Sequence, residues 1–189
     1  LNRGGLAYVV TPGTEGMLVT PLPLVFQRER RRLVGHLARA NRHWRDAPPG
    51  AETVAIYAGP DAYISPSSYP SKREHGKVVP TWDYETVTVY GDLTFHDDTD
   101  WIRENVEDLT AVHEAGRDPA WTLDEAPGPY VAQMLKAIVG VELTITRWEG
   151  KAKMSQNQSD PNVQGVLDDL AARDTHQARA AAERIEHYR

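Results

Sequence analysis

The sequence predicts an α+β fold in which a small barrel of antiparallel strands carries accessory helices. Two segments, residues 86–95 and 139–146, alternate apolar and polar side chains with a period of two, which is typical of half-buried antiparallel strands. Helical patterns separate these segments and follow the second one. The 189 residues, 40% hydrophobic and 25% charged, have the composition of an ordinary globular protein with one main domain.

The first half of the chain is predicted to supply the remaining strands. Apolar runs at residues 6–11 and 17–26 flank a glycine-containing turn, and shorter runs follow at residues 33–36 and 53–58. Residues 62–65 either extend the last of these strands or pair with it. Alternate residues of the second run share one face: Leu18, Thr20, Leu22, Leu24 and Phe26.

Two prolines in the second run restrict how its neighbours can pair. Pro21 and Pro23 lie two residues apart, so both missing N–H groups face the same neighbouring strand. That side cannot carry a full hydrogen-bond ladder. A barrel that is open or split along one seam would tolerate this gap.

The helices are expected in the second half of the chain. Within an insertion at about residues 98–138, a first helix is capped by Asp97, Asp98 and Asp100 and a second spans residues 129–138. The first carries an apolar stripe of Ile102, Val106 and Leu109. We predict a barrel domain at residues 1–158 and a helical extension at 159–189.

The helical extension begins with a recognisable start signal. Asp160 is expected to cap a helix whose first residue is Pro161. Residues at helical spacing then form its apolar stripe: Val163, Val166, Leu167 and Leu170. The tail at residues 175–189 is alanine-rich and charged, and is expected to be an exposed or partner-packed helix.

Composition and missing motifs exclude several classes of protein. The chain has no cysteine, so disulfides, zinc–thiolate sites and thiol nucleophiles are impossible. No apolar run approaches the ~20 residues of a membrane span, and we expect a cytoplasmic protein without a membrane partner. Dinucleotide, phosphate-loop, zinc-protease and serine-hydrolase motifs are missing, and the histidines are scattered, so no metal site is predicted. The chain begins at Leu1 rather than Met, so we expect preceding residues.

Charge is distributed unevenly along the chain. Residues 1–96 carry 11 Lys and Arg against 9 Asp and Glu, whereas residues 97–189 carry 10 against 18. Seven of the arginines lie between Arg28 and Arg45. An anionic ligand is therefore expected in the first half, although the net charge of −6 does not favour extensive contact with nucleic acid.

Four segments are candidates for a ligand site. The first is residues 35–45, where a strand end leads into one or two helical turns at residues 38–45. Arg39 and Arg42 would share one helical face, and helix N-terminal amides together with guanidinium groups favour a phosphate. The alternative is a surface turn of solvated arginines in which Trp44 caps the core.

The second segment is residues 63–72, which combines four serines, two tyrosines and two prolines with Lys72. Prolines fix the backbone and so position the hydroxyl groups at low entropic cost. Such a loop can line a polar ligand, and the alternative is a rigid loop that faces water.

The third and fourth segments flank the two clearest strands. In residues 77–84, Pro80 would bend the chain so that Trp82 and Tyr84 lie near the barrel mouth. Flat aromatic side chains there could hold a planar ring. The alternative is an aromatic plug that closes the barrel end. Residues 150–157 form a polar, cationic exit from the last strand, for which the alternative is a solvated loop.

Taken together, these segments resemble the PaiB family of FMN-binding split-barrel proteins, which are negative transcriptional regulators linked to sporulation and protease-gene repression. The resemblance covers residues 5 to about 170. It depends on Gly35–Asn41 with Trp44, Tyr63–Ser67 with Tyr69–Lys72, Val79–Tyr84, and Gly150–Lys151 with Lys153–Asn157.

The resemblance implies a split β-barrel with accessory helices, a homodimer, and FMN (flavin mononucleotide) at the barrel–dimer junction. It implies that the turn carrying Arg39 and Asn41 holds the phosphate. The loop at residues 65–72 and the strand start at residues 81–84 would border the ribityl chain or the ring. Lys153 and Gln156 of the partner subunit would contact the FMN. The complete predicted site comprises His36, Arg39, Asn41, Ser65, Ser67, Tyr69, Lys72, Thr81, Trp82, Asp83, Tyr84, Lys153 and Gln156.

The sequence departs from the family pattern at two places. In the family a helical segment usually precedes the first strand, and we expect this segment to be absent here. Asp83 stands where relatives often have Asn. A carboxylate is unfavourable beside a reduced, anionic flavin and donates to a flavin carbonyl only when protonated, so we expect an effect on FMN affinity more than on the fold.

Three functions are compatible with these residues. The first is an FMN-binding transcriptional regulator acting as a homodimer, in which any contact with DNA would depend on residues 28–45, because no helix-turn-helix signature is present. The second is an FMN-dependent oxidoreductase on a small substrate, for which no residue stands out as an acid or base. The third is a haem-binding or haem-degrading protein, with an axial ligand from His36, His43, His75, His176 or His187.

Overall fold

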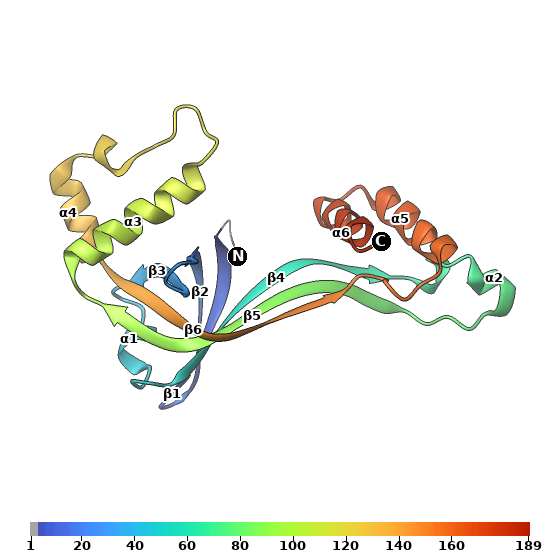
Figure 1. The fold of residues 1–189 in the computed structure, drawn as a ribbon, viewed down its shortest axis with the longest axis horizontal. Coiled ribbons are helices and arrows are strands. Elements are labelled where there is room, and N and C mark those ends of the chain that lie inside the picture. The colour runs from blue at the N-terminus through green and yellow to red at the C-terminus, as the bar shows by residue number, and fades with distance from the viewer. Residues whose placement is uncertain (1–3) are drawn as a thin grey trace. The chain divides into compact units, whose positions relative to one another are not determined.

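The computed structural model describes residues 4–189 and confirms the mixed α+β architecture (Figure 1). Six antiparallel strands form a barrel in the order β1-β2-β3-β6-β5-β4. The strands are β1 Gly5–Gly13, β2 Gly16–Gln27, β3 Arg32–Ala38, β4 Glu52–Ile64, β5 Thr81–His96 and β6 Ile138–Lys153. The described helices are α1 His43–Asp46, α2 Ser71–His75, α3 Thr99–Glu114, α4 Gly128–Lys136, α5 Asp160–Arg173 and α6 His176–His187, with 3-10 turns η1 Pro66–Ser68 and η2 Leu123–Glu125.

The chain forms two compact units that share its three longest strands. Residues 4–57 and 88–149 form one unit, here called the barrel unit, and residues 58–87 and 150–189 form the other, the groove unit. Each boundary falls inside a strand, namely β4, β5 or β6. The predicted division at residue 158 stays a prediction.

The barrel unit is built on the β1–β2 hairpin. The two strands pair from Gly5 with Leu24 to Gly13 with Gly16. Strand β3 pairs with β2 only from Leu24 onward, just past Pro21 and Pro23. The short ladder agrees with the gap expected from two prolines that cannot donate on that side.

Alternation in the strands creates the core of the barrel unit. Val139, Val141 and Leu143 of β6 are buried as the period of two predicts, and they meet buried residues of the neighbouring strands. Gly140 allows the ring of Trp101 from α3 to lie directly on β6, because a Cβ there would come within 2.3 Å of that ring. Helices α3 and α4 share a small apolar cluster of their own.

The predicted helix with caps at Asp97, Asp98 and Asp100 is confirmed as α3, which has Asp98 as its N-cap. The expected helical turns at residues 38–45 are largely wrong. Only His43–Asp46 is helical, because Asn41 accepts the backbone N–H of His43 and so ends the preceding turn. Arg39 therefore lies outside the helix and shares no helical face with Arg42.

The groove unit has a separate core that joins α5 and α6 to β4. Its buried residues include Ile64, Met154 and Leu170, and Figure 1 shows α5 and α6 side by side. Residues 62–64 extend strand β4 rather than pairing with it, and Ser65 is the N-cap of η1. The tail forms α6 and packs its buried alanines against α5, within the same core.

Two boundaries in this unit differ from expectation. Helix α5 begins at Asp160, with Ser159 as N-cap, one residue earlier than predicted. Strand β6 continues to Lys153, where a loop was expected from Gly150. None of the helices among residues 4–189 is long and apolar enough to cross a bilayer.

Candidate ligand groove

A groove of about 540 Å³ lies within the groove unit. Ligand sites in proteins have volumes of ~300–1,000 Å³, so this volume suits a small molecule or cofactor. One wall is formed by α2 and the segment that follows it, and the other by the end of β6 and the turn into α5. Its lining residues include Tyr69, Ser71, His75, Lys77, Val78, Val79, Thr81, Asp83, Lys153, Ser155 and Asn162.

Asp83 is the most deeply buried charged group of the groove. Its side chain is 1% exposed, and its Oδ2 accepts a hydrogen bond of 2.6 Å from Ser155 Oγ. Burial raises the pKa of the Asp83 carboxyl, while the Ser155 hydrogen bond and the charge of Lys153 oppose that rise. The groove therefore contains a carboxyl group whose neutral form is favoured relative to an exposed aspartate.

Ser155 reaches Asp83 from an unusual backbone conformation. Its φ of 56° lies in the left-handed region, which costs a non-glycine residue of order 1 kcal/mol or more. Local hydrogen bonds hold this turn, because Gln156 Oε1 accepts from Met154 N at 2.7 Å and Gln158 N donates to Ser155 O at 3.0 Å. Gln156 thus shapes the turn rather than lining the groove.

Lys153 closes the groove beside the start of β5. Its Nζ donates to Thr81 Oγ1 and to the carbonyl oxygen of Trp82, the latter at 2.9 Å. The ammonium group is thereby held at the groove wall, where it can meet an anionic ligand.

Strand alternation separates the predicted β5 residues into two sets. Thr81 and Asp83 face the groove, whereas Trp82 faces the other side and packs edge-on to Tyr63, with ring centroids 6.0 Å apart. Trp82 lines a smaller hollow of about 210 Å³ beside the start of α6. Tyr84, which shares this parity, is 37% exposed and is not among the lining residues of the groove.

The serine-rich loop forms part of one groove wall. Tyr69 is buried, and burial followed by the nearby charge of Asp83 raises the pKa of its hydroxyl. Ser65 accepts from the backbone of Ser67, and Lys72 Nζ donates to Ser67 Oγ at 2.9 Å. Ser65, Ser67 and Lys72 thus stabilise η1 and α2, and they do not line the groove.

Ser71 is the clearest residue that the predicted site omitted. Its Oγ is buried and has no hydrogen-bond partner within the described part of the chain, although it lines the groove. Ser71 is the first residue of α2, and its backbone N–H donates to Asn162 Oδ1 at 3.3 Å, which fixes its position. Its place in the serine-rich segment was the available signal, whereas Asn162 comes from a distant helix and gave none.

The remaining predicted residues, His36, Arg39 and Asn41, lie in the barrel unit. Arg39 donates to the carbonyl oxygen of Lys136 at 2.8 Å and pairs with Asp97. Asn41 Nδ2 donates to Thr20 Oγ1 at 3.3 Å. Both side chains therefore have structural partners, and their role in holding a phosphate stays a prediction.

The histidines considered as haem ligands differ in availability. His43 is buried, and its two ring nitrogens lie 2.9 Å from Thr20 Oγ1 and from Thr11 Oγ1, so both are occupied. His36 has a buried Nδ1 that lacks a partner among the described residues. Burial lowers the pKa of both imidazoles. The described residues contain no cluster of three His, Asp or Glu side chains suited to a metal ion.

Solved structures define the class of fold. The chain matches the flavocytochrome Anf3 of Azotobacter vinelandii with a TM-score of 0.56 at 15% identity, over 80% of this chain and 64% of that one. It matches the FAD and heme binding protein of Mycobacterium smegmatis with a TM-score of 0.54 at 19% identity, over 80% and 67%. The fold is thus a split barrel of the type found in these flavin- and haem-binding proteins.

The family follows from the sequence comparison. The model described as "Putative FMN-binding domain" matches residues 1–147, and the chain belongs to this family. FMN is the cofactor that this family model names, as the sequence predicted.

Two relatives show how far the similarity extends. The chain is 29% identical to "Protease synthase and sporulation protein PAI 2" of Bacillus subtilis, over 98% of this chain and 88% of that protein. It is 32% identical to an uncharacterized protein of Emericella nidulans over 61% of this chain, and spans about half of that protein, 51%.

We predict that Asp83→Asn raises stability at neutral pH. The raised pKa means that the folded state binds the Asp83 proton more tightly than the unfolded chain does, so the contribution of Asp83 falls as pH rises from its ordinary value of 3.8 through the raised pKa. Asn keeps an oxygen that accepts from Ser155 without this loss. Urea unfolding of both proteins across the acidic and neutral range should show the advantage of the variant shrinking as pH falls toward 3.8.

The matched control is Asp92→Asn, which removes an exposed carboxyl from the same strand. An advantage of Asp83→Asn that grew toward acidic pH would contradict the raised pKa.

Proposed function

We propose that the chain binds FMN in the groove of the groove unit and acts, as a homodimer, as a negative transcriptional regulator. The observation that carries the FMN site is the buried, unpartnered Oγ of Ser71 in a groove that also presents Lys153 and Asp83. Buried polar groups are normally hydrogen-bonded, so this hydroxyl indicates a polar partner that residues 4–189 do not supply.

The donor and acceptor set of the groove fits the parts of FMN. The hydroxyls of Ser71 and Thr81 suit a ribityl chain, and an ammonium group such as that of Lys153 suits the phosphate. Val78 and Val79 offer apolar contact to the ring. Asp83 would accept from the imide N–H of the flavin when ionised and donate to a flavin carbonyl when protonated.

Bound FMN supplies electron and hydride transfer, while the protein supplies position and electrostatics. Lys153 would neutralise the phosphate, and Ser155 would orient the Asp83 carboxyl toward the bound molecule. The walls formed by Tyr69 and the two valines would limit the access of water to the ring.

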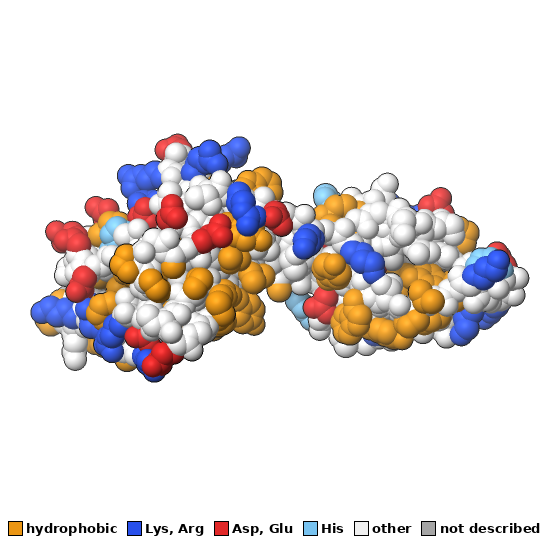
Figure 2. Space-filling model, turned by 90° about the horizontal axis from the view of Figure 1, so that it is seen from below, with side chains coloured by type: hydrophobic (Ala, Val, Ile, Leu, Met, Phe, Trp, Pro, Cys, Tyr) orange, Lys and Arg blue, Asp and Glu red, His pale blue; other side chains and the backbone are white. Residues whose placement is uncertain are grey.

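An apolar face of the barrel unit supports the homodimer. Leu6, Tyr8, Met17 and Val19 are between 49% and 62% exposed, and the pairing of β1 with β2 places them on one face of the hairpin. Figure 2 shows hydrophobic side chains gathered at the surface of this protein. Exposed apolar patches of this kind mark interaction sites, and we assign this one to a second copy of the chain.

The turn between β2 and β3 supports contact with DNA. Arg28, Arg30 and Arg31 are exposed on this tight turn, whereas Arg32 is withdrawn into an ion pair with Glu142 at 2.6 Å. The regulatory role is further supported by the relative from Bacillus subtilis, whose name refers to protease synthesis and sporulation.

We predict that purified protein binds FMN and that Lys153→Ala weakens this binding by about tenfold or more, as expected for loss of a charge-assisted hydrogen bond. Ser71→Ala should weaken it less. Titrating FMN and following the quenching of its fluorescence measures both affinities.

Lys151→Ala is the control, since it removes a lysine from the same strand that does not line the groove. Equal affinities of Lys153→Ala and Lys151→Ala would place FMN elsewhere. An absorbance spectrum with a Soret band and no flavin bands would favour haem.

We predict that the protein is a dimer in solution and that the double variant Tyr8→Glu and Val19→Glu is a monomer, because two carboxylates would be buried in the proposed interface. Sedimentation equilibrium measures the mass. The control Met134→Glu alters an apolar residue that is 40% exposed on α4. A double variant that remains dimeric would exclude this face.

We predict salt-dependent DNA binding that Arg28→Gln combined with Arg31→Asn reduces at every salt concentration, since phosphate contacts release counterions. Asn suits position 31, where φ is 48°. Fluorescence anisotropy with labelled duplex measures the affinity, with Arg117→Gln as an exposed control. The absence of binding at low salt would contradict a direct role on DNA.

A further inference from the structure

A second polar cleft lies within the barrel unit, between α3 and the ends of β2 and β3. Its volume is about 220 Å³. The β2–β3 turn and the strand ends beside it contribute Gln27, Arg30 and Arg32, and α3 contributes Glu104, Asn105, Glu107 and Asp108. None of these residues belongs to the FMN site proposed above.

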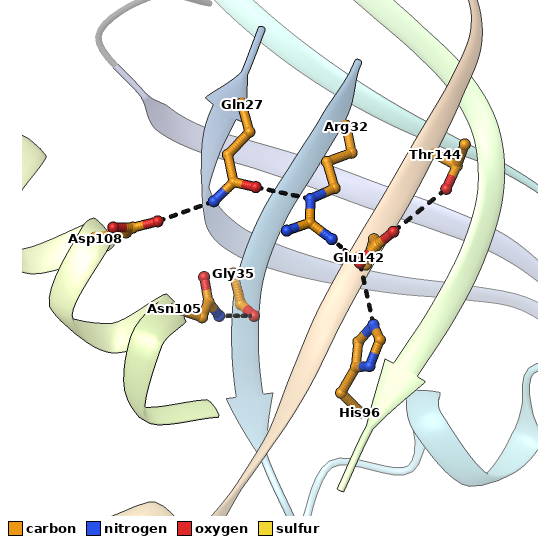
Figure 3. A network of polar contacts seen from close by, with 8 residues as sticks. All are labelled: Gln27, Arg32, Gly35, His96, Asn105, Asp108, Glu142 and Thr144. Carbon is orange, nitrogen blue, oxygen red and sulfur yellow. Dashed lines mark hydrogen bonds and ion pairs between the residues drawn. The ribbon is translucent and has the colours of Figure 1, made fainter. Parts of the chain in front are cut away.

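Asn105 contributes to this cleft a hydrogen-bond acceptor that no donor among the described residues meets. The side chain is only 4% exposed, and its Nδ2 donates to Gly35 O at 2.5 Å. That bond fixes the amide, because the opposite orientation would set two oxygens against each other. Oδ1 then has no partner within the described residues, and Figure 3 shows it pointing away from Gly35 toward the space beside Gln27 and Asp108.

A chain of hydrogen bonds joins the two walls of the cleft and fixes their side chains. Gln27 Nε2 donates to Asp108 Oδ2 at 2.9 Å, and Gln27 Oε1 accepts from Arg32 Nε at 2.7 Å. Arg32 also pairs with Glu142, which in turn lies 3.2 Å from His96 Nε2 (Figure 3). Because each member is held by the next, the walls are already organised before any ligand arrives.

The two walls differ in charge. Helix α3 presents carboxylates from Glu104, Glu107 and Asp108 beside the Asn105 oxygen, whereas the opposite side presents the guanidinium groups of Arg30 and of Arg32, the latter already paired with Glu142. A purely anionic ligand would face the carboxylates, and a purely cationic ligand would face the arginines. The arrangement suits a molecule that carries both charges a short distance apart.

We propose that this cleft binds the zwitterion of a small α-amino acid. The ammonium group would donate to Asn105 Oδ1 and to the Asp108 carboxylate, and the carboxylate would accept from Arg30 and Arg32. Val34 and Trp101 would border a small side chain. The volume of the cleft restricts the ligand to a small amino acid.

The test is an NMR titration of the ¹⁵N-labelled full chain with L-alanine. Propionate, which lacks the ammonium group, and ethylamine, which lacks the carboxylate, serve as matched half-ligands. We expect saturable shifts at the Asn105 side-chain amide and at α3 backbone amides with L-alanine, and affinities at least about tenfold weaker with each half-ligand.

Variants of cleft residues test whether the NMR shifts arise from binding of L-alanine in this cleft. Asp108→Asn and Arg30→Gln should each weaken L-alanine binding by about tenfold or more, and both alter surface groups, so their spectra should remain dispersed. The control Asp92→Asn should bind as the parent does. Absence of saturable shifts with L-alanine would mean that ordered water alone satisfies Asn105 and would overturn the proposal, as would equal binding by the two variants and the control. Propionate binding as strong as that of L-alanine would equally overturn it, showing an adventitious anion only.

Discussion

The hydrogen bond between Ser155 and Asp83 is the interaction on which the candidate FMN site depends. At 2.6 Å, it ties the turn after β6 to the first residues of β5. Ser155 makes it from a left-handed backbone conformation, and the buried neighbour Met154 anchors that turn in the core. The same turn follows directly on Lys153, so the position of the groove cation is set together with that of the groove carboxyl.

Much of the fold could be predicted because alternation and caps are local signals. The strands at residues 86–95 and 139–146 and the capped helix α3 follow from patterns within a few residues. The end of β6 could not be predicted in this way. Residues 147–153 are exposed on both faces, so they show no apolar alternation, and only pairing with neighbouring strands makes them extended.

The sequence named part of the lining of this groove but not its arrangement. Tyr69, Thr81, Asp83 and Lys153 were all expected from the sequence, and they line one groove. The sequence treated Trp82 and Asp83 as parts of one motif, yet adjacent residues of a strand face opposite sides. Helix α5 supplies Asn162 from a distant part of the chain, a contact that depends on tertiary packing and leaves no local signal.

The surroundings of Asp83 in the structure change what is expected of its charge. As a residue in a sequence it suggests a fixed negative charge, which is unfavourable beside a reduced, anionic flavin. In the groove it is almost fully buried, and burial raises its pKa. If FMN binds in this groove as proposed, a carboxyl that takes up a proton more readily would bond to it in both charge states, accepting when ionised and donating when neutral. An Asn, whose charge is fixed at zero, offers both a donor and an acceptor but cannot exchange a proton with the bound molecule. The difference between the two residues is therefore a difference in how the site responds to the charge of its ligand.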